Sequence, residues 1–424
     1  MDAPLRTRSC IRERNCNARS QRGRGSRQIC MQMTRDTYHR VWEDAAEVRR
    51  IVERQSREWP ELFPDGIEDG FQLTGRLPES RKMPGVRLRQ LRLRDGRVFS
   101  LRPSFVVSYM MGDIDELEGP LLLLSIGTPC WIVTKIFGHN DMKWQRLLER
   151  LGRSSLAGST VRNPDRLPQH LVADEHHADW CGEKGYVAFT VGGGCILGAA
   201  LTEAADEKHL TEAYGQFAEE SRGIKPNYEP ETVNTDGWFA TQNTFKTLFA
   251  SIQVVLCFLH GFLKIRDRCR KDHELHTEVW NVYRAETGTE FHSRMAAFQI
   301  WFEARNWSRA VSEMVSKLWK HAKQYAVSYS HPGCQRTSNM VDRLMNGLTR
   351  FLYHGRGLHG HQSTSELRLR GWSLLQNFRP FAPRSNRPRE YHSPAHRLNQ
   401  KAYDAHWLHN LQLSCSLLGY KRCT

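Results

Sequence analysis

The spacing of apolar side chains predicts a helix and a small sheet in the N-terminal part of the chain. Residues 36–58 place apolar side chains at helical intervals and predict an amphipathic helix. Residues 60–85 are rich in Pro and Gly and predict a loop. Two apolar runs within residues 86–107 flank Asp95 and Gly96, a dipeptide typical of hairpin turns. We therefore expect the hairpin to form a small sheet beside the helix.

Residues 114–152 show the pattern of three short helices, with breaks at the glycine-containing turns 127–129 and 138–140. The third helix is basic, and its non-apolar faces carry Lys143, Arg146, Arg150 and Arg153. Short helices joined by such a turn are similar to a helix-turn-helix, so we expect a DNA-binding region that uses these four side chains. A plain helical connector is the alternative. Residues 154–169 have the composition of a linker.

From residue 167 onward, strand and helix patterns alternate. The expected order is β β β α β α β, with strands at 171–173, 186–191, 195–201, 232–235 and 252–258 and helices at 202–221 and 241–249. A three-strand meander followed by helix-crossed parallel strands is an α/β arrangement of the RNase H-like kind. The segment that follows, residues 262–325, is strongly helical, which fits the helical insertion that the family resemblance described below implies.

These patterns divide the chain into six parts. The expected parts are 1–35, a basic disordered tail; 36–112, the helix and small sheet; 113–166, the helix-turn-helix-like region; 167–261 with 326–380, the RNase H-like core; 262–325, the helical insertion; and 381–424, a basic arm. Met31 and Met33 are alternative start positions within the tail.

Charge is concentrated at the two ends of the chain. The net charge is +15, of which residues 1–35 contribute +7 and residues 343–424 contribute +10, which leaves −2 for residues 36–342. A near-neutral body with basic ends suits a polyanion, because each neutralised phosphate releases condensed counterions. Solvated tails without a partner are the alternative for both ends.

Cysteine usage and hydropathy indicate a cytoplasmic protein that has no membrane partner. The 11 cysteines are odd in number and include no C-x-x-C pair, which disfavours a disulfide scaffold or a zinc ribbon. The longest apolar stretch, residues 248–263, contains polar side chains and is too short to span a bilayer. The N-terminus lacks the apolar region of a secretory signal.

Two aspartates follow strands that are neighbours in the expected sheet. Asp174 follows the strand at 171–173, and Asp236 follows the strand at 232–235. Adjacent carboxylates repel unless a cation lies between them, and their hard oxygen atoms suit Mg²⁺ or Mn²⁺. Two such ions about 3.5–4 Å apart can stabilise both the attacking and the leaving oxygen of a phosphoryl displacement. The alternative is that each aspartate only ends its strand.

These aspartates lie within a longer set of motifs, at 171–177, 185–198 and 233–238, and the pair Cys257 and His260 follows. Together the motifs resemble DDE-type transposases of bacterial insertion sequences, and the C-x-x-H pair resembles the signature of the Mutator-like branch. The resemblance implies an Mg²⁺-dependent enzyme that cleaves double-stranded DNA at terminal inverted repeats and joins the freed 3′-hydroxyl to target DNA. It also implies a homo-oligomer at the nucleoid in the bacterial cytoplasm.

The resemblance requires a third acid beyond the helical insertion. Asp342, which lies 106 residues after Asp236 near the start of a predicted helix, matches this position best, with Asp where Glu is usual. Glu366 is the alternative third acid. We expect Asp174, Asp236 and Asp342 to bind the metal ions, with Cys257 and His260 near the site but not bound to metal.

Two further basic residues, Arg368 and Arg370, are expected to contact the DNA backbone, since phosphate contacts position a protein without reading sequence. Trp238 is expected to pack in the core, although stacking on a flipped base is possible at its position. Three other functions remain open: a catalytically degenerate, transposase-derived DNA-binding protein, an RNase H-like nuclease that does not join strands, and a zinc-binding interaction protein.

Overall fold

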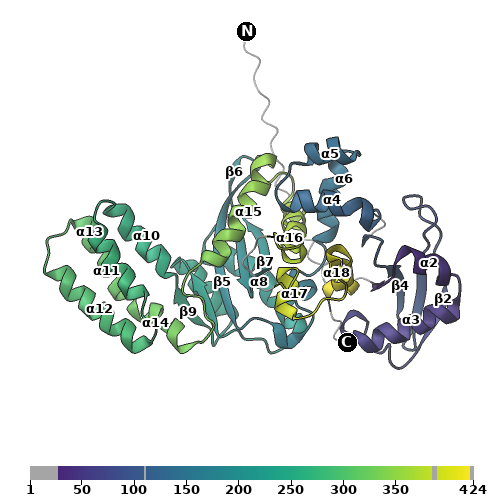
Figure 1. Cartoon of the computed structure of the whole chain (residues 1–424), viewed down its shortest axis with the longest axis horizontal. Helices are drawn as coiled ribbons and strands as arrows, with labels where there is room; N and C mark the ends of the chain where they lie inside the picture. Colours follow the sequence, from purple (N-terminus) through teal and green to yellow (C-terminus); the bar gives the residue numbers. More distant parts are fainter. Residues whose placement is uncertain (1–26, 109–110, 384–388, 421–424) are drawn as a thin grey trace, which may run out of the picture.

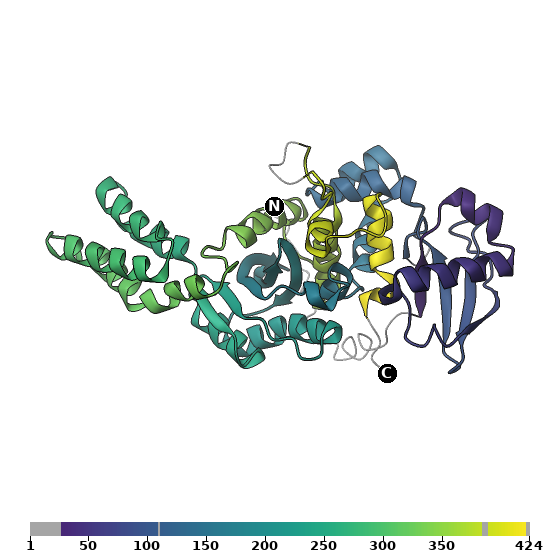
Figure 2. The same cartoon turned by 60° about the horizontal axis from the view of Figure 1, so that its bottom comes forward.

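The structure is a computed structural model, and it describes residues 27–108, 111–383 and 389–420. Over these residues the protein is mixed α/β and has two sheets. Figure 1 shows a small N-terminal sheet at one end, the larger sheet in the middle and a group of helices at the other end. Figure 2 shows the same order from a second direction.

The N-terminal sheet has four strands in the order β1-β4-β3-β2. The strands are β1 (Gln28–Met31), β2 (Phe71–Arg76), β3 (Arg89–Leu93) and β4 (Val98–Pro103). The predicted hairpin is confirmed: β3 and β4 are antiparallel, and Gly96 adopts a φ of +87° in the turn between them. Strand β2 was missed because its Gly- and Pro-rich surroundings predicted a loop.

The predicted helix at 36–58 is two helices, α2 (Arg35–Val41) and α3 (Ala45–Glu58). They are separate because the Asp44 carboxylate accepts the backbone N–H groups of Ala46 and Glu47 and so starts a new helix. The expectation of disorder over 1–35 is wrong for β1, which pairs with β4 and buries its apolar side chains. It is also wrong for residues 32–35, which lead from β1 into α2, whereas residues 1–26 lie outside the described residues.

Three of the next helices confirm the prediction for 114–152: α4 (Ile114–Ser125), α5 (Cys130–Phe137) and α6 (Asp141–Leu151). The predicted linker at 154–169 is wrong, because it contains a fully buried helix, α7 (Leu156–Thr160). The small side chains that predicted a linker instead allow close backbone packing. A Cβ at Gly158 would lie 2.1 Å from the carbonyl oxygen of Gly419.

The helix α16 (Gln362–Phe378) joins this helical region to the central sheet, since it packs on both α6 and β7. Glycines permit the close crossing of α6 and α16. A Cβ at Gly371 would lie 2.1 Å from the carbonyl oxygen of Leu148, and one at Gly152 would lie 1.8 Å from that of Leu367. The helices α4 to α6 therefore share one apolar core with the sheet.

The central sheet has the strand order β7-β6-β5-β8-β9. The strands are β5 (His170–Trp180), β6 (Glu183–Gly192), β7 (Cys195–Thr202), β8 (Thr232–Thr235) and β9 (Gln253–Leu256). Strand β6 is antiparallel to both of its neighbours, β5 and β7, whereas β8 is parallel to both of its neighbours, β5 and β9. The predicted order of strands and helices in this region is what the structure shows.

Helices cover both faces of this sheet. The helices α8 (Glu207–Ile224) and α9 (Phe239–Leu248) pack on the face that contains Ala173, while α15 (Asn339–Gly355) and α16 pack on the face that contains Val172. Successive side chains of a strand point to opposite faces, so alternate residues of β5 contribute to different cores. Figure 1 shows α15 and α16 beside β5 and β7.

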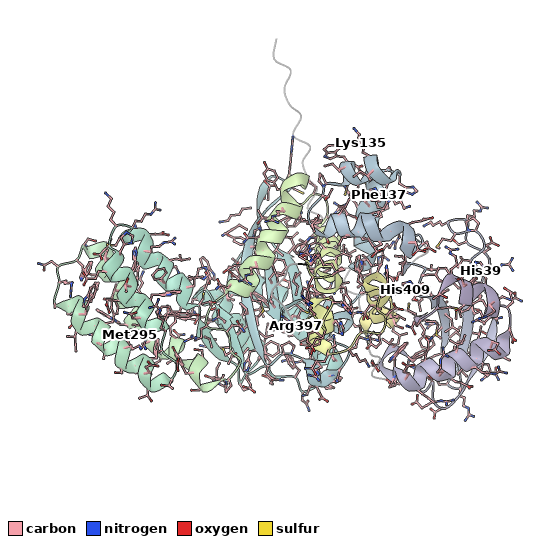
Figure 3. All side chains as sticks on the ribbon, viewed as in Figure 1. His39, Lys135, Phe137, Met295, Arg397 and His409 are labelled. Atoms are coloured by element: carbon pink, nitrogen blue, oxygen red, sulfur yellow. The ribbon has the colours of Figure 1, made fainter. Side chains whose placement is uncertain are left out.

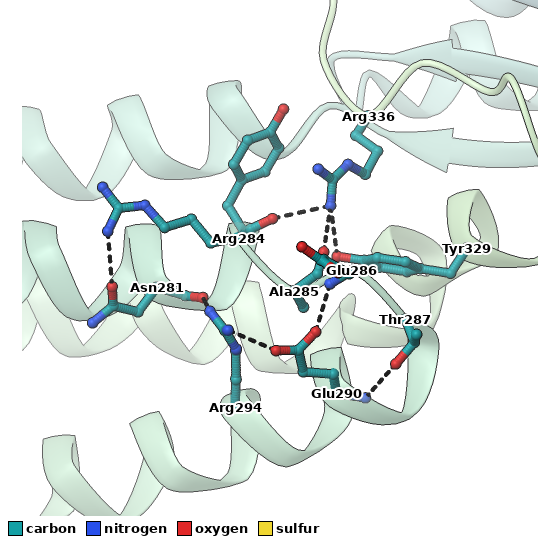
Figure 4. A network of polar contacts seen from close by, with 10 residues as sticks. Asn281, Arg284, Ala285, Glu286, Thr287, Glu290, Arg294, Tyr329 and Arg336 are labelled. Atoms are coloured by element: carbon teal, nitrogen blue, oxygen red, sulfur yellow. Dashed lines mark hydrogen bonds and ion pairs between the residues drawn. The ribbon is translucent and has the colours of Figure 1, made fainter.

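The predicted helical segment after β9 forms five helices. They are α10 (Phe258–Arg268), α11 (His273–Tyr283), α12 (Gly288–Glu303), α13 (Arg309–Lys320) and α14 (Ala322–Ser330). They bury an apolar core of their own, against which Trp301, Trp307 and Trp319 pack. Arg336 ties this group to the chain that leads to α15, because it donates to the carbonyl oxygens of Tyr283 and Ala285 and to the Tyr329 hydroxyl (Figure 4).

The expected basic arm at 381–424 differs from the structure. Its helices α17 (Pro394–Asn399) and α18 (Trp407–Ser414) fold back onto the molecule. Trp407 joins the central core, and Leu413 joins the core of the N-terminal sheet. His409 of α18, labelled in Figure 3, contacts the Ser104 hydroxyl through Nδ1 at 2.8 Å. None of the helices in the described parts of the chain is long and apolar enough to cross a membrane.

Candidate active site

Strand register brings Asp174 and Asp236 together. Strands β5 and β8 are parallel, with Leu171 opposite Val233 and Val172 opposite Asn234. Asp174 and Asp236 each follow the last of these pairs by two residues, and they are close enough for the charge of Asp236 to raise the pKa of Asp174. Since side chains alternate along a strand, Asp174 lies on the same face of β5 as Val172, which is the face covered by α15. The expectation that Asp174 ends its strand is wrong, because β5 continues to Trp180 through its pairing with β6.

The surroundings of Asp174 oppose its negative charge. Burial, and then the charges of Asp236 and Glu175, raise the pKa of Asp174 to about 7. The backbone N–H of Glu175 donates to the Asp174 carboxylate at 2.9 Å, which acts in the opposite direction but does not cancel these effects. The charge of His260 also lowers the pKa of Asp174, but it is a smaller effect than burial and the two neighbouring acids.

Glu175 is a buried acid that the sequence analysis did not single out. It points to the opposite face from Asp174, where its Oε1 accepts hydrogen bonds from Tyr214 and Thr241, both at 2.7 Å. Burial raises its pKa despite these two donors. Strand alternation after Asp174 predicts this orientation, but no local pattern identifies the partners, which lie on α8 and α9.

The C-x-x-H pair lies at the end of β9, where Cys257 precedes α10. Ser338, just before α15, connects this pair to the third predicted acid. Its backbone N–H donates to Cys257 Sγ at 3.1 Å, and its hydroxyl donates to Asp342 Oδ2 at 2.9 Å. The same hydroxyl lies 3.3 Å from His260 Nδ1. The predicted near-site residues and Asp342 therefore share one hydrogen-bonded cluster.

His260 places positive charge near the aspartates. Its hydrogen bond with Cys257 is the main cause that raises the pKa of His260 to about 9, and the charges of Asp174 and Asp236 add to the effect. Burial raises the pKa of the Cys257 thiol, but its hydrogen bonds with His260 and Ser338 outweigh burial and lower it. At neutral pH, an imidazolium therefore offsets part of the negative charge of the site.

Hydrogen bonds attach the segment before α15 to the ends of the parallel strands. Asn234 Nδ2 donates to the Gln335 carbonyl oxygen at 2.9 Å. The backbone N–H of Phe258 donates to the Arg336 carbonyl oxygen at 3.1 Å. Thr232 on β8 also lies 3.3 Å from Cys334 through its hydroxyl and the Sγ atom. These contacts hold the start of α15, and with it Asp342, at this edge of the sheet.

The two aspartates fit a metal site in which protein side chains supply only one or two ligands, as is common for Mg²⁺, better than a site in which they supply all the ligands. Among the described residues, no group of three or more His, Cys, Asp or Glu side chains is close enough to hold a metal ion. Mg²⁺ in phosphoryl-transfer sites commonly uses one or two carboxylates, with waters and substrate phosphates as its other ligands. The carboxylate oxygens of Asp174 and Asp236, and the raised pKa of Asp174, are consistent with such an ion.

Glu366, the alternative third acid, lies elsewhere. It is buried on α16, where Gln216 Nε2 of α8 donates to it at 3.4 Å. Helix α16 packs on β7, which is two strands away from β5 in the sheet. The structure therefore associates Asp342, and not Glu366, with the aspartate pair.

A basic hollow lies along α6. Its volume is about 560 Å³, and its basic lining consists of Lys82, Lys143, Arg146 and Arg150 beside His139. Three of these residues are predicted DNA contacts, and Lys82 comes from the loop before β3, which no pattern connected to α6. Arg153 is exposed but does not line the hollow.

The other two predicted DNA contacts are engaged inside the protein. Arg370 is buried, forms an ion pair with Glu220, and donates to the carbonyl oxygens of Gly152 and Ser154. This placement is incompatible with a direct DNA contact. Arg368 forms an ion pair with Glu149 at 2.9 Å and is largely covered. The helical pattern did not reveal that this side of α16 faces α6 and α8.

A scan of protein-family profiles finds no match to this chain, and a search of curated protein sequences finds none either.

Proposed function

We propose that this protein is a DNA transposase of the DDE type, which cleaves DNA at the ends of its element and joins them to target DNA with Mg²⁺ or Mn²⁺. The main support is that the parallel pairing of β5 and β8 ends just before Asp174 and Asp236, whose charges interact, and that His260 and Ser338 connect this pair to Asp342. The proposal includes an RNase H-like core, supported by the β7-β6-β5-β8-β9 strand order, in which the first two pairings are antiparallel and the last two are parallel.

In this proposal each residue near the site has a distinct role. Asp174 and Asp236 would bind the divalent ions, which would activate the attacking oxygen and stabilise the leaving one. Ser338 would orient the Asp342 carboxylate toward the same edge through its hydrogen bond. His260, as an imidazolium, would offset negative charge before the metal binds, while remaining outside the coordination sphere.

The basic hollow on α6 would bind the backbone of double-stranded DNA, either at the terminal inverted repeats or at the target. Lys82, Lys143, Arg146 and Arg150 provide the cationic lining that phosphate contacts require. We also propose that the protein acts as a homo-oligomer in the bacterial cytoplasm, at the nucleoid, because two element ends must be processed together.

A catalytically degenerate, DNA-binding descendant of a transposase is the second candidate. The observation in its favour is that Asp342 contacts Ser338 and forms no three-ligand group with Asp174 and Asp236 among the described residues. In that case the basic hollow would function without the chemistry of the acidic site.

Cleavage of DNA that contains the gene and its native flanks separates the two candidates. Purified protein with Mg²⁺ should break and rejoin strands at the flanks, and Asp174→Asn or Asp236→Asn should reduce the rate about 100-fold or more while DNA binding is retained. Asp179→Asn, at an exposed position on the same strand, is the control and should leave the rate unchanged. Binding without cleavage by the wild type would favour the degenerate form, and normal cleavage by Asp174→Asn would overturn the proposed chemistry.

A further inference from the structure

The parallel pairing of β5 with β8 ends before it reaches the two aspartates. Its last pair joins Val172 to Asn234, two residues ahead of Asp174 and of Asp236. Beyond this point β5 continues against β6, while the other chain turns at Gly237, which has a φ of +99°, and enters α9. The pairing of the two strands therefore does not by itself fix the spacing between the two carboxylates.

A side-chain hydrogen bond connects the two chains beyond the end of this pairing. The hydroxyl of Thr241, in the first turn of α9, donates to Oε1 of Glu175 on β5 at 2.7 Å. Glu175 directly follows Asp174, and Thr241 lies five residues after Asp236. A helical threonine often bonds to the carbonyl oxygen of the preceding turn, whereas this hydroxyl is directed to another element. The bond therefore links the strand that carries one aspartate to the helix that follows the other.

Glu175 is the point at which three elements meet. Its Oε1 also accepts a hydrogen bond from the Tyr214 hydroxyl on α8 at 2.7 Å, and both Tyr214 and Thr241 are buried. Hydrogen bonds to a carboxylate are stronger than those between neutral groups, so one ionised side chain can hold both donors. Glu175 thus joins β5 to α8 and α9 directly beside Asp174.

The turn between Asp236 and α9 is held by Trp238. The backbone N–H of Trp238 donates to the Asp236 carboxylate at 2.8 Å, and its Nε1 donates to the Ala205 carbonyl oxygen at 3.0 Å. The Trp238 side chain is 53% exposed, so the expectation that it packs in the core is wrong. Because the turn is short and hydrogen-bonded to the carboxylate itself, a displacement of α9 would be transmitted to Asp236.

We propose that Glu175 and Thr241 are positioning residues that set the spacing of Asp174 and Asp236 and so select Mg²⁺ over a larger divalent cation. The inference rests on the proposed function, in that the two aspartates bind a divalent ion, and adds the residues that decide which ion binds. Mg²⁺ requires near-ideal octahedral geometry with ligands at about 2.0–2.1 Å, whereas Ca²⁺ accepts variable geometry at about 2.3–2.6 Å. A looser spacing should therefore weaken Mg²⁺ binding much more than Ca²⁺ binding.

Thermal unfolding of the full chain over a series of Mg²⁺ or Ca²⁺ concentrations measures both affinities without any need for catalysis. Thr241→Val removes the hydroxyl at nearly constant volume and should weaken Mg²⁺ binding about 10-fold, with Ca²⁺ binding changed less than about 2-fold. Thr241→Ser keeps the donor and should restore the wild-type ratio of the two affinities. Glu175→Gln keeps the acceptor oxygen and removes a charge that acts on both ions alike, so it should also retain this ratio.

Thr244→Val is the matched control and should leave the ratio unchanged. Thr244 is buried about one turn later on α9, but its hydroxyl lies 3.2 Å from that of Thr211 on α8. Equal losses for the two ions in Thr241→Val, no loss for either ion, or the same change of ratio in Thr244→Val would overturn the positioning role.

The cleavage experiment distinguishes this role from the proposed function. If the ratio shifts as expected but the wild type does not cleave DNA, the transposase proposal fails and the positioning role stands. If the wild type cleaves and the ratio does not shift, only the positioning role fails. If neither ion stabilises the wild type, the positioning role fails together with the metal site.

Discussion

At the scale of single residues, Asp174 lies where its negative charge is disfavoured, so the stability of the folded protein should depend on pH. Burial and the neighbouring acids raise its pKa from 3.8 to about 7. Between these pH values the folded chain binds a proton that the unfolded chain has lost. The metal-free protein should therefore lose stability as pH rises from about 4 to about 7, and should remain less stable above that range.

Asp174→Asn removes this penalty. We expect the difference in Tm between the variant and the wild type to become more positive as pH rises from 4 to 8, measured by thermal unfolding in a chelator. Adding Mg²⁺ at pH 8 should raise the Tm of the wild type but not that of the variant, because binding to the folded state alone stabilises it. Parallel Tm curves over this pH range would contradict the electrostatic account of the site.

Ser338 is the second residue with a testable role, since it joins the C-x-x-H pair to Asp342. Ser338→Ala should raise the Mg²⁺ concentration needed for half-maximal cleavage about 10-fold, in the range typical of groups that orient metal ligands. Ser338→Thr retains the hydroxyl and should restore the requirement. Ser373→Ala is a matched control, because Ser373 is also buried but bonds within α16. An unchanged Mg²⁺ requirement would show that Ser338 is structural only.

At the scale of elements, helices α6 and α16 each carry a basic residue that was predicted to bind DNA, but the two residues lie in different environments. Arg370 is buried against Glu220, whereas Arg146 lines the open hollow. Removal of one partner of a buried pair leaves an uncompensated charge, so Arg370→Ala should lower the free energy of unfolding by about 3–5 kcal/mol. Denaturant unfolding measures this loss.

Arg146→Ala should change stability by less than about 0.5 kcal/mol, as is usual for surface sites. It should instead weaken duplex binding and reduce the dependence of log K on log salt by about one unit. Duplex affinity over a series of salt concentrations measures this effect. A loss of stability without an effect on DNA binding for Arg146→Ala would place the DNA interface elsewhere.

The elements themselves were largely predictable because their signals are local. The apolar run in β8 and the amphipathic pattern of α8 depend only on nearby residues. Strand β2 and helix α7 were missed because Gly, Ser and Thr are common in loops. These residues also permit close packing, as Gly158 does against Gly419. Composition alone therefore does not distinguish a flexible loop from a buried segment whose side chains are small because neighbouring backbone lies close to it.

At the scale of the whole molecule, the C-terminal segment connects the two sheets. Cys30 of β1 donates its backbone N–H to the Ser416 hydroxyl at 3.1 Å, and this hydroxyl donates to the Leu62 carbonyl oxygen at 2.6 Å. Trp407 and Leu413, on the same short helix, enter different cores. The segment is thus part of the folded body, although its basic composition predicted an arm.

Leu413→Ala should therefore lower the free energy of unfolding by about 2–5 kcal/mol, because it removes a fully buried side chain and leaves a cavity. Denaturant unfolding is the measurement, and Ile300→Ala, at a position that is 73% exposed, is the control with little expected change. If Leu413→Ala had no more effect than Ile300→Ala, residues 407–414 would be peripheral, as an arm would be.

The sequence by itself determined the order of strands and helices along the chain, because hydrophobic periodicity is encoded locally. That the strands before Asp174 and Asp236 are neighbours was expected from the RNase H-like arrangement, and the pairing of β5 with β8 shows it. Only the tertiary structure decided which polar residues meet. Ser338 reaches Cys257 across 81 residues, and Arg370 is buried against Glu220 across 150. Such contacts depend on which faces of distant elements pack together, and this is set by the fold as a whole.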